Sequence, residues 1–146
     1  MTKLDCVEFA PGRRFIGRLP HGRDLLTSIK EFCTNASIQT ASFSFAGQVS
    51  AFTIGTYDQE QHVYITYAQE APLEIVSGSG NVSLMDGDLQ IHAHAVLADK
   101  QGKTIGGRLF SDTILFAGEI EIQELTGKPA ERAYDPDTGL SLWKTR

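Results

Sequence analysis

Along most of the chain after residue 40, apolar residues alternate with polar ones at a period of two. The clearest runs lie at 41–45, 63–67, 89–95 and 119–123. Successive side chains on a β-strand point to opposite faces of the sheet, so this alternation is typical of strands that bury one face. Turn-forming clusters separate the runs at 57–59, 86–88 and 101–103. We therefore expect antiparallel strands joined by short turns.

One segment near the start of the chain follows the period of a helix instead. Between Asp24 and Asn35 the apolar residues recur three and four positions apart, and they are Leu25, Leu26, Ile29, Phe32 and Cys33. Asp24 is suited to cap the start of this helix, and Asn35 to end it. The pattern predicts an α+β fold, with a mostly antiparallel β-sheet and one main α-helix.

The length of the chain predicts a single domain over residues 1–146, because 146 residues can bury a core without further support. The last part, 127–146, has little periodicity, yet it ends with two leucines and the lone Trp143. Such apolar side chains are rarely left in water. We expect 127–146 to be an ordered C-terminal extension that packs on its own domain or on a neighbouring subunit.

Cysteine content and terminal composition predict a soluble cytoplasmic protein. Cys6 and Cys33 are too few for a disulfide framework, and we expect both to be reduced thiols. The first residues lack the basic and apolar run of a signal peptide, and no stretch of about eighteen apolar residues occurs.

Net charge argues against direct binding to duplex DNA. The chain carries 18 acidic and 13 basic side chains, for a formal net charge of -5. Proteins that neutralise DNA phosphates normally present a basic stripe. Here that stripe is short, with Arg13, Arg14, Arg18 and Arg23, and no Arg-Gly-Arg-Pro minor-groove hook is present. We expect weak DNA binding.

The strongest chemical signal is the pair His92 and His94 in the alternating run 89–97. Residues two apart on a strand share a face, so both imidazoles leave the same side of the sheet. A turn at 98–102 lets 105–110 return as the next antiparallel strand, which places Arg108 opposite His94. Two imidazoles are half of a zinc site. A guanidinium has no free lone pair and repels a cation, so Arg108 cannot complete that site.

Several blocks in order resemble the plant and prokaryote conserved domain, also called PPC or DUF296. They cover nearly the whole chain and are 15–26, 73–81, His92-Ala93-His94, Gly106-Gly107 and Glu119. The resemblance implies the fold predicted above and a homotrimer. In plants the domain accompanies AT-hook DNA-binding motifs, which implies a DNA-associated regulator as an alternative function. Prokaryotic members usually have Gly-Gly-His where this chain has Gly106-Gly107-Arg108, and their third histidine resembles a metal ligand.

A trimer also has a physical reason, because one short helix covers a sheet face only in part. The other face then needs a cover. Depending on the strand register, its large side chains would be drawn from Phe43, Phe45, Phe52, Tyr64, Tyr67 and Phe110.

With the resemblance, we expect a small cleft that binds a polar or anionic ligand. Arg108 would be a bidentate donor, His92 and His94 neutral donors, and Glu74 would orient one imidazole. The simpler alternative is that both histidines are hydrogen-bonded residues on a half-buried strand. Glu74 and Glu119 are candidate general bases, and for Glu119 a surface role is favoured.

We predict no catalytic residues, because no nucleophile is evident, and no firm cofactor. His92 and His94 remain candidate ligands for a divalent metal such as zinc, with the third ligand missing. The expected function is a trimeric module that binds a small ligand or another protein, and the alternatives are a DNA-binding-associated regulator or a metal-dependent enzyme. Its expected partners are further copies of itself, other proteins or a small anion, with no membrane.

Overall fold

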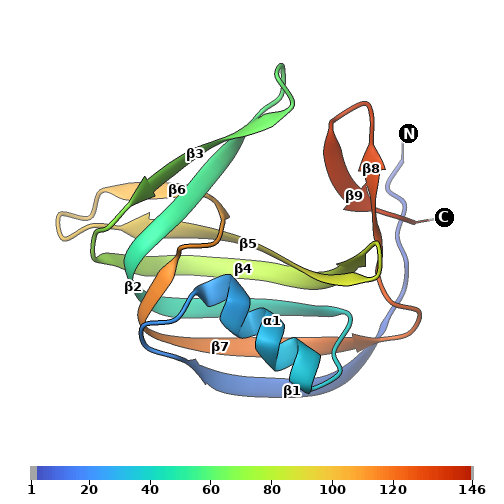
Figure 1. The fold of residues 1–146 in the computed structure, drawn as a ribbon. Helices are drawn as coiled ribbons and strands as arrows, with labels where there is room; N and C mark the ends of the chain where they lie inside the picture. Colours follow the sequence, from blue (N-terminus) through green and yellow to red (C-terminus); the bar gives the residue numbers. More distant parts are fainter. Residues whose placement is uncertain (1–2, 146) are drawn as a thin grey trace.

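The computed structural model describes residues 3–145 and contains one helix and nine strands in this range (Figure 1). The elements, in chain order, are β1 (Ala10–Leu19), α1 (Leu25–Asn35), β2 (Ala41–Asp58), β3 (Val63–Gln69), β4 (Leu73–Met85), β5 (Asp88–Ala98), β6 (Thr104–Leu109), β7 (Ile114–Thr126), β8 (Arg132–Asp135) and β9 (Leu140–Trp143). All of the alternating runs noted in the sequence form strands, and the predicted α+β fold is confirmed.

The strands β1 to β7 form one seven-stranded sheet with antiparallel pairing throughout. The long strand β2 changes partners along its length. Its first part lies between β7 and β4, while Phe52–Asp58 pairs with β3. Figure 1 shows this second part of β2 rising away from the rest of the sheet together with β3. We call residues 52–69 the arm.

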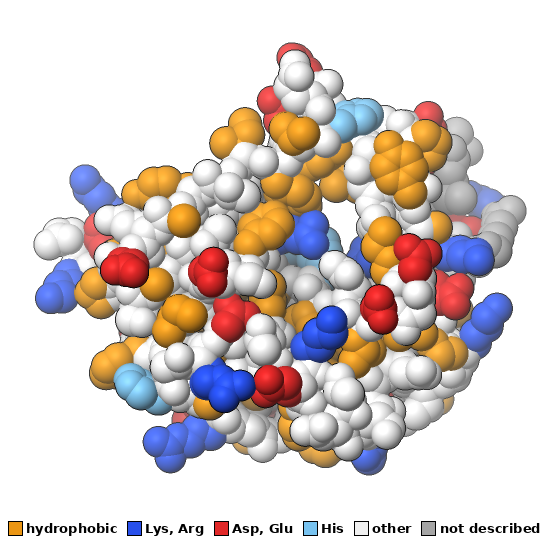
Figure 2. All heavy atoms as spheres, viewed as in Figure 1, with side chains coloured by type: hydrophobic (Ala, Val, Ile, Leu, Met, Phe, Trp, Pro, Cys, Tyr) orange, Lys and Arg blue, Asp and Glu red, His pale blue; other side chains and the backbone are white. Residues whose placement is uncertain are grey.

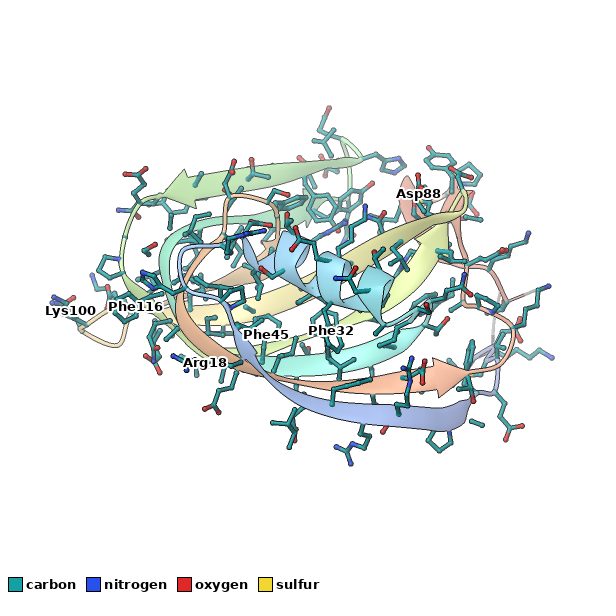
Figure 3. All side chains as sticks on the ribbon, turned by 60° about the horizontal axis from the view of Figure 1, so that its bottom comes forward. Arg18, Phe32, Phe45, Asp88, Lys100 and Phe116 are labelled. Atoms are coloured by element: carbon teal, nitrogen blue, oxygen red, sulfur yellow. The ribbon has the colours of Figure 1, made fainter. Side chains whose placement is uncertain are left out.

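Helix α1 begins and ends where the sequence predicts. The side chain of Asp24 accepts a hydrogen bond from the backbone N–H of Thr27 at 2.9 Å and another from Thr113 at 3.1 Å, so one carboxylate caps the helix and ties it to the loop before β7. Leu25, Ile29 and Cys33 are buried. Of the two phenylalanines labelled in Figure 3, Phe45 of β2 is buried, whereas Phe32 of α1 stays partly exposed and packs against Phe15 of β1.

The expectation that large aromatic side chains lie on an uncovered sheet face is wrong for three residues. Phe43, Phe45 and Phe52 are each at most 5% exposed. Gly78 and Gly80 on β4 explain part of this burial, because a Cβ at either glycine would overlap the ring of Phe45 or Phe43. These three aromatic side chains therefore belong to the same hydrophobic core as the buried residues of the helix.

The C-terminal extension forms a two-stranded hairpin, β8–β9, that folds back onto the edge of β4. Leu84 donates a backbone hydrogen bond to the carbonyl of Ala130 at 2.9 Å and forms a bridge with Glu131. In Figure 1 this C-terminal hairpin rises opposite the arm. Both elements thus rise above β4 and β5 in this view.

Strand β5 crosses the molecule between two tight turns. Asp88 at its start and Lys100 just after its end lie on opposite sides in Figure 3. The turn before β5 has positive φ at Asp86 and Gly87, 52° and 84°, as in a type I′ hairpin. No helix within residues 3–145 is long and apolar enough to span a membrane.

Candidate functional site

His92 and His94 lie side by side on β5, on the face opposite the buried residues Ile91, Ala93 and Ala95. Their ring centroids are 4.9 Å apart. Strand β6 returns along β5 with Arg108 paired to His94, so the predicted register is confirmed. The period-two pattern and the turn at 98–102 therefore place two imidazoles and a guanidinium together.

Arg108 lies against two aromatic rings that contact each other, and it makes no polar contact with the rest of the described chain. Its Cζ lies 5.0 Å from the ring centroid of Tyr64 and 5.1 Å from that of Phe110. Among residues 3–145, neither a hydrogen bond nor an ion pair involves its guanidinium. The five N–H donors of Arg108 are therefore free to bind a ligand.

A second arginine, Arg132, reaches the same cluster from β8. Its guanidinium donates to Ser83 Oγ at 3.2 Å, Asn81 Oδ1 at 2.9 Å and the carbonyl of Ser141 at 3.0 Å. It also lies 4.0 Å from the ring centroid of Trp143. Three hydrogen bonds and a stacked ring fix this side chain, so Arg132 brings a positive charge that cannot easily move away.

A cavity of about 420 Å³ lies beside His92, His94, Arg108 and Arg132, and we call it the β5 cavity. The arm contributes Tyr57, His62, Val63 and Tyr64, and the C-terminal hairpin contributes Arg132 and Gly139 to Leu142. In Figure 2 a hollow lies between the arm and the hairpin, with blue and pale-blue side chains at its edge. The arm and hairpin also touch, because Tyr57 Oη donates to the carbonyl of Thr138 at 2.6 Å.

Burial and positive charge keep both imidazoles neutral at neutral pH. Burial, followed by the charges of Arg108 and Arg132, lowers the pKa of His92 from its ordinary 6.5 to about 4. Burial and Arg108 also lower the pKa of His94. Neutral imidazole has one N–H donor and one acceptor nitrogen. Each histidine can therefore donate a hydrogen bond without adding charge.

Acidic side chains are missing from the described surroundings of this cluster. None of the residues that line the β5 cavity in the range 3–145 is Asp or Glu. Glu74 pairs with Ala98 on β5, whereas His94 pairs with Ser79, so four residues, roughly 13 Å at the rise of a strand, separate Glu74 from His94. Glu74 instead accepts a hydrogen bond from Gln48 at 3.0 Å. Glu119 lies opposite Arg18 on β1.

The donor set does not fit a divalent cation. Zinc sites in proteins use three or four ligands drawn from His, Cys, Asp and Glu. No group of three such side chains is close enough to share a metal ion in the described part of the chain. Beside His92 and His94 stand the cations Arg108 and Arg132, which repel a metal ion.

Sequence reasoning missed Arg132, and little in the sequence marks it. It lies in the aperiodic segment after 127, and its contacts with Asn81 and Ser83 join positions 51 and 49 residues apart. A weak signal was available in Asn81 and Ser83 themselves, which are polar positions on the same sheet face as His92. The buried hydroxyl of Ser83 requires a partner, and Arg132 supplies it.

The fold and the cavity define a class of small α+β proteins in which one helix packs on a bent antiparallel sheet and the opposite face carries a polar cluster. The chain belongs to the Plants and Prokaryotes Conserved (PCC) domain family, whose model matches residues 7–126. The resemblance found in the sequence is thereby confirmed. The C-terminal hairpin, including Arg132, lies beyond the matched range.

Two solved archaeal structures resemble the whole chain. One is a metal-containing protein of Archaeoglobus fulgidus, with 41% identity, a TM-score of 0.90, and coverage of 98% of this chain and 99% of that one. The other is a plant- and prokaryote-conserved protein of Pyrococcus horikoshii, with 36% identity, a TM-score of 0.90 and coverage of 97% of each chain.

Two further relatives carry functional names. A protein of Ralstonia eutropha JMP134, provisionally named a DNA-binding protein, is 25% identical with a TM-score of 0.77, and the match covers 88% of this chain and 89% of that one. The bifunctional protein GlmU of Synechococcus sp. (strain JA-3-3Ab) is 31% identical over 124 residues, which are 84% of this chain and 19% of that protein. The chain thus spans about a fifth of this curated relative.

Proposed function

We propose that this protein is a binding module that holds a small anion in the β5 cavity through Arg108, His92 and His94. The observation that carries the proposal is a pair of guanidinium groups, Arg108 and Arg132, beside a cavity with no carboxylate in its described lining. A charge removed from water is costly unless an opposite charge or hydrogen bonds compensate it. A bound anion would provide that compensation.

The donors have complementary roles in this proposal. Arg108 offers a free planar fork that matches the two oxygens of a carboxylate or phosphate, and such charge-assisted pairs are the strong ones. His92 and His94 add neutral N–H donors next to it. Arg132 is already bound to Asn81, Ser83 and Ser141, so it acts mainly through its charge.

Titration with inorganic phosphate, followed by the imidazole NMR signals of His92 and His94, tests the proposal. Loss of a charge-assisted contact is worth about 1.5–3 kcal/mol, so Arg108→Gln should weaken phosphate binding about tenfold or more. Arg14→Gln is the matched control, since it removes the same charge from an exposed position on β1. The absence of saturable shifts in the unmodified protein would refute an anion site.

Binding is favoured over catalysis because the histidines have no nucleophile as a partner in the described chain. Within residues 3–145, the contacts of His92 and His94 are with each other and with charged neighbours, and no hydroxyl or thiol is hydrogen-bonded to either ring. A nucleophile that a histidine activates as general base needs such a contact. Anion binding requires only donors, which the cluster supplies.

We further propose that the module works as a homotrimer. Several exposed apolar side chains support this idea, because a single copy leaves them in water. They are Ile16, Val63, Ile65, Tyr67, Val76, Val96 and Phe116, all at least 40% exposed. These surfaces also suit binding to another protein.

A DNA-associated regulator is the second candidate, favoured by the provisional name of the Ralstonia protein. Two arginines of the basic stripe are already paired, Arg13 with Glu124 at 2.8 Å and Arg23 with Glu31 at 3.2 Å. We therefore expect only weak binding to duplex DNA at physiological salt. A nanomolar dissociation constant in a fluorescence anisotropy titration at that salt would contradict this expectation.

A further inference from the structure

The β5 cavity is larger than an inorganic anion requires, and apolar side chains form part of its lining. Its volume of about 420 Å³ falls in the range of small-molecule sites, about 300–1,000 Å³. The donors come from β5, β6 and β8, and the rest of the lining includes four apolar side chains. These are Val63, Met85, Leu140 and Leu142.

The contact between the arm and the C-terminal hairpin forms one boundary of the cavity. Tyr57 Oη is bonded to the carbonyl of Thr138, and Gly139 packs so closely that an added Cβ would lie 2.6 Å from Tyr57 Oη. The two elements therefore meet at residues that line the cavity, Tyr57 and Gly139. The space between them has the volume of a small-molecule site.

The charges indicate the headgroup. Arg108 and Arg132 together carry two positive charges, and the lowered pKa values of His92 and His94 mean that the imidazoles add none at neutral pH. A phosphate monoester carries about -1.5 to -2 charges at pH 7 and offers three acceptor oxygens. Its negative charge matches the two guanidinium groups, and its oxygens can accept hydrogen bonds from Arg108 and from the two imidazoles.

From these observations we infer that the β5 cavity binds an organic phosphate monoester, with the phosphate on Arg108 and a small apolar body against Leu140 and Leu142. The inference rests on the proposed anion site and adds the class of ligand. Burial of the apolar body gives affinity that inorganic phosphate cannot have, because apolar surface leaves water on binding.

Calorimetry with phenyl phosphate and inorganic phosphate tests the inference. In the unmodified protein, phenyl phosphate should bind about tenfold or more tightly than inorganic phosphate, on the scale of one buried apolar side chain. Leu140→Ser should remove this preference and leave the affinity for inorganic phosphate unchanged, which also shows that the variant is folded. Leu142→Ser, at a more exposed position, is the second variant if Leu140→Ser does not fold.

The outcomes separate the two proposals. Equal affinities for phenyl phosphate and inorganic phosphate in the unmodified protein would overturn the inference and leave the anion site standing. Tighter binding of benzoate than of phenyl phosphate would also overturn it, because the headgroup would then be a carboxylate. Failure of all three probes to bind would overturn both the inference and the proposed function.

Discussion

At the scale of single residues, Arg108 determines which ligands the cluster can hold. It occupies the position opposite His94 on β6, where a third imidazole would complete a three-nitrogen set with an open fourth position. The guanidinium instead repels cations and attracts anions. In our proposal, one side chain therefore separates an anion site from a metal site on the same strands.

Replacing this side chain should change the preferred ligand. We predict that the unmodified protein binds zinc poorly, and that Arg108→His raises zinc affinity by several kcal/mol while abolishing phosphate binding. Isothermal calorimetry with zinc on both proteins checks this, with Arg14→His as the control for a histidine added elsewhere. Tight stoichiometric zinc in the unmodified protein, lost on changing His92 or His94, would mean that another residue supplies the third ligand.

His92 should make the folded state sensitive to acid. Its folded pKa of about 4 lies below the ordinary 6.5, so the unfolded chain takes up the proton first as the pH falls. The free energy of unfolding should therefore decrease between pH 6.5 and pH 4. In His92→Gln this decrease should be smaller, as measured by urea unfolding at several pH values. His21→Gln, at an exposed position outside the β5 cavity, is the control, and an unchanged pH profile in His92→Gln would contradict the prediction.

At the scale of elements, the position of Arg108 depends on how closely β6 approaches β2. Strand β6 pairs with β5 on one side, and Arg108 also pairs with Gly55 of β2 on the other. A Cβ at Gly107 would lie only 2.4 Å from the carbonyl oxygen of Gly55. Glycine at this position therefore allows both pairings at once.

Gly107→Ala should consequently move β6 and disturb the proposed anion site. We expect it to lower the free energy of unfolding by about 1–3 kcal/mol, the usual cost of forcing extra atoms into a packed region, and to weaken phosphate binding. Gly106→Ala is the matched control, because the nearest atom to its added Cβ is at an ordinary 3.5 Å. Urea unfolding and phosphate titration measure the two effects, and equal behaviour of the two variants would argue against a special role for Gly107.

At the scale of the whole molecule, the distribution of apolar surface supports self-association. The phenylalanines of β2 are buried, whereas several aliphatic residues on the arm, on β1 and on β4–β5 are exposed, with Ile16 at 85%. Burying such patches between copies is favourable at about 25 cal/mol per Å² of apolar surface. Self-association through these patches does not depend on the β5 cavity.

We predict a homotrimer in solution. Sedimentation equilibrium at micromolar protein should give three times the monomer mass of 16.0 kDa. Ile16→Asp and Ile65→Asp, each placing a charge on an exposed patch, should identify which surface forms the interface by shifting the equilibrium toward monomer. The monomer mass for the unmodified protein at this concentration would contradict the prediction.

Local sequence determined those features that depend on near neighbours. The helix follows from the three- and four-residue spacing between Asp24 and Asn35, and its start follows from a side chain that caps the next turn. Period two places His92 and His94 on one face, and a short turn sets the register that brings Arg108 opposite His94. Each of these relations spans few residues, so backbone geometry alone decides it.

Tertiary structure decided what the cluster meets, because that depends on contacts between distant segments. Only the folding of the C-terminal hairpin onto β4 brings Arg132 to Asn81 and Ser83. The length of β4 separates Glu74 from His94, although both lie in the same pair of strands. Phe43 and Phe45 pack against Gly80 and Gly78 of the neighbouring strand, and the course of β2 away from the sheet raises the arm that lines the cavity. A period in the sequence gives the face of a strand, but curvature and long-range packing determine which side chains converge above it.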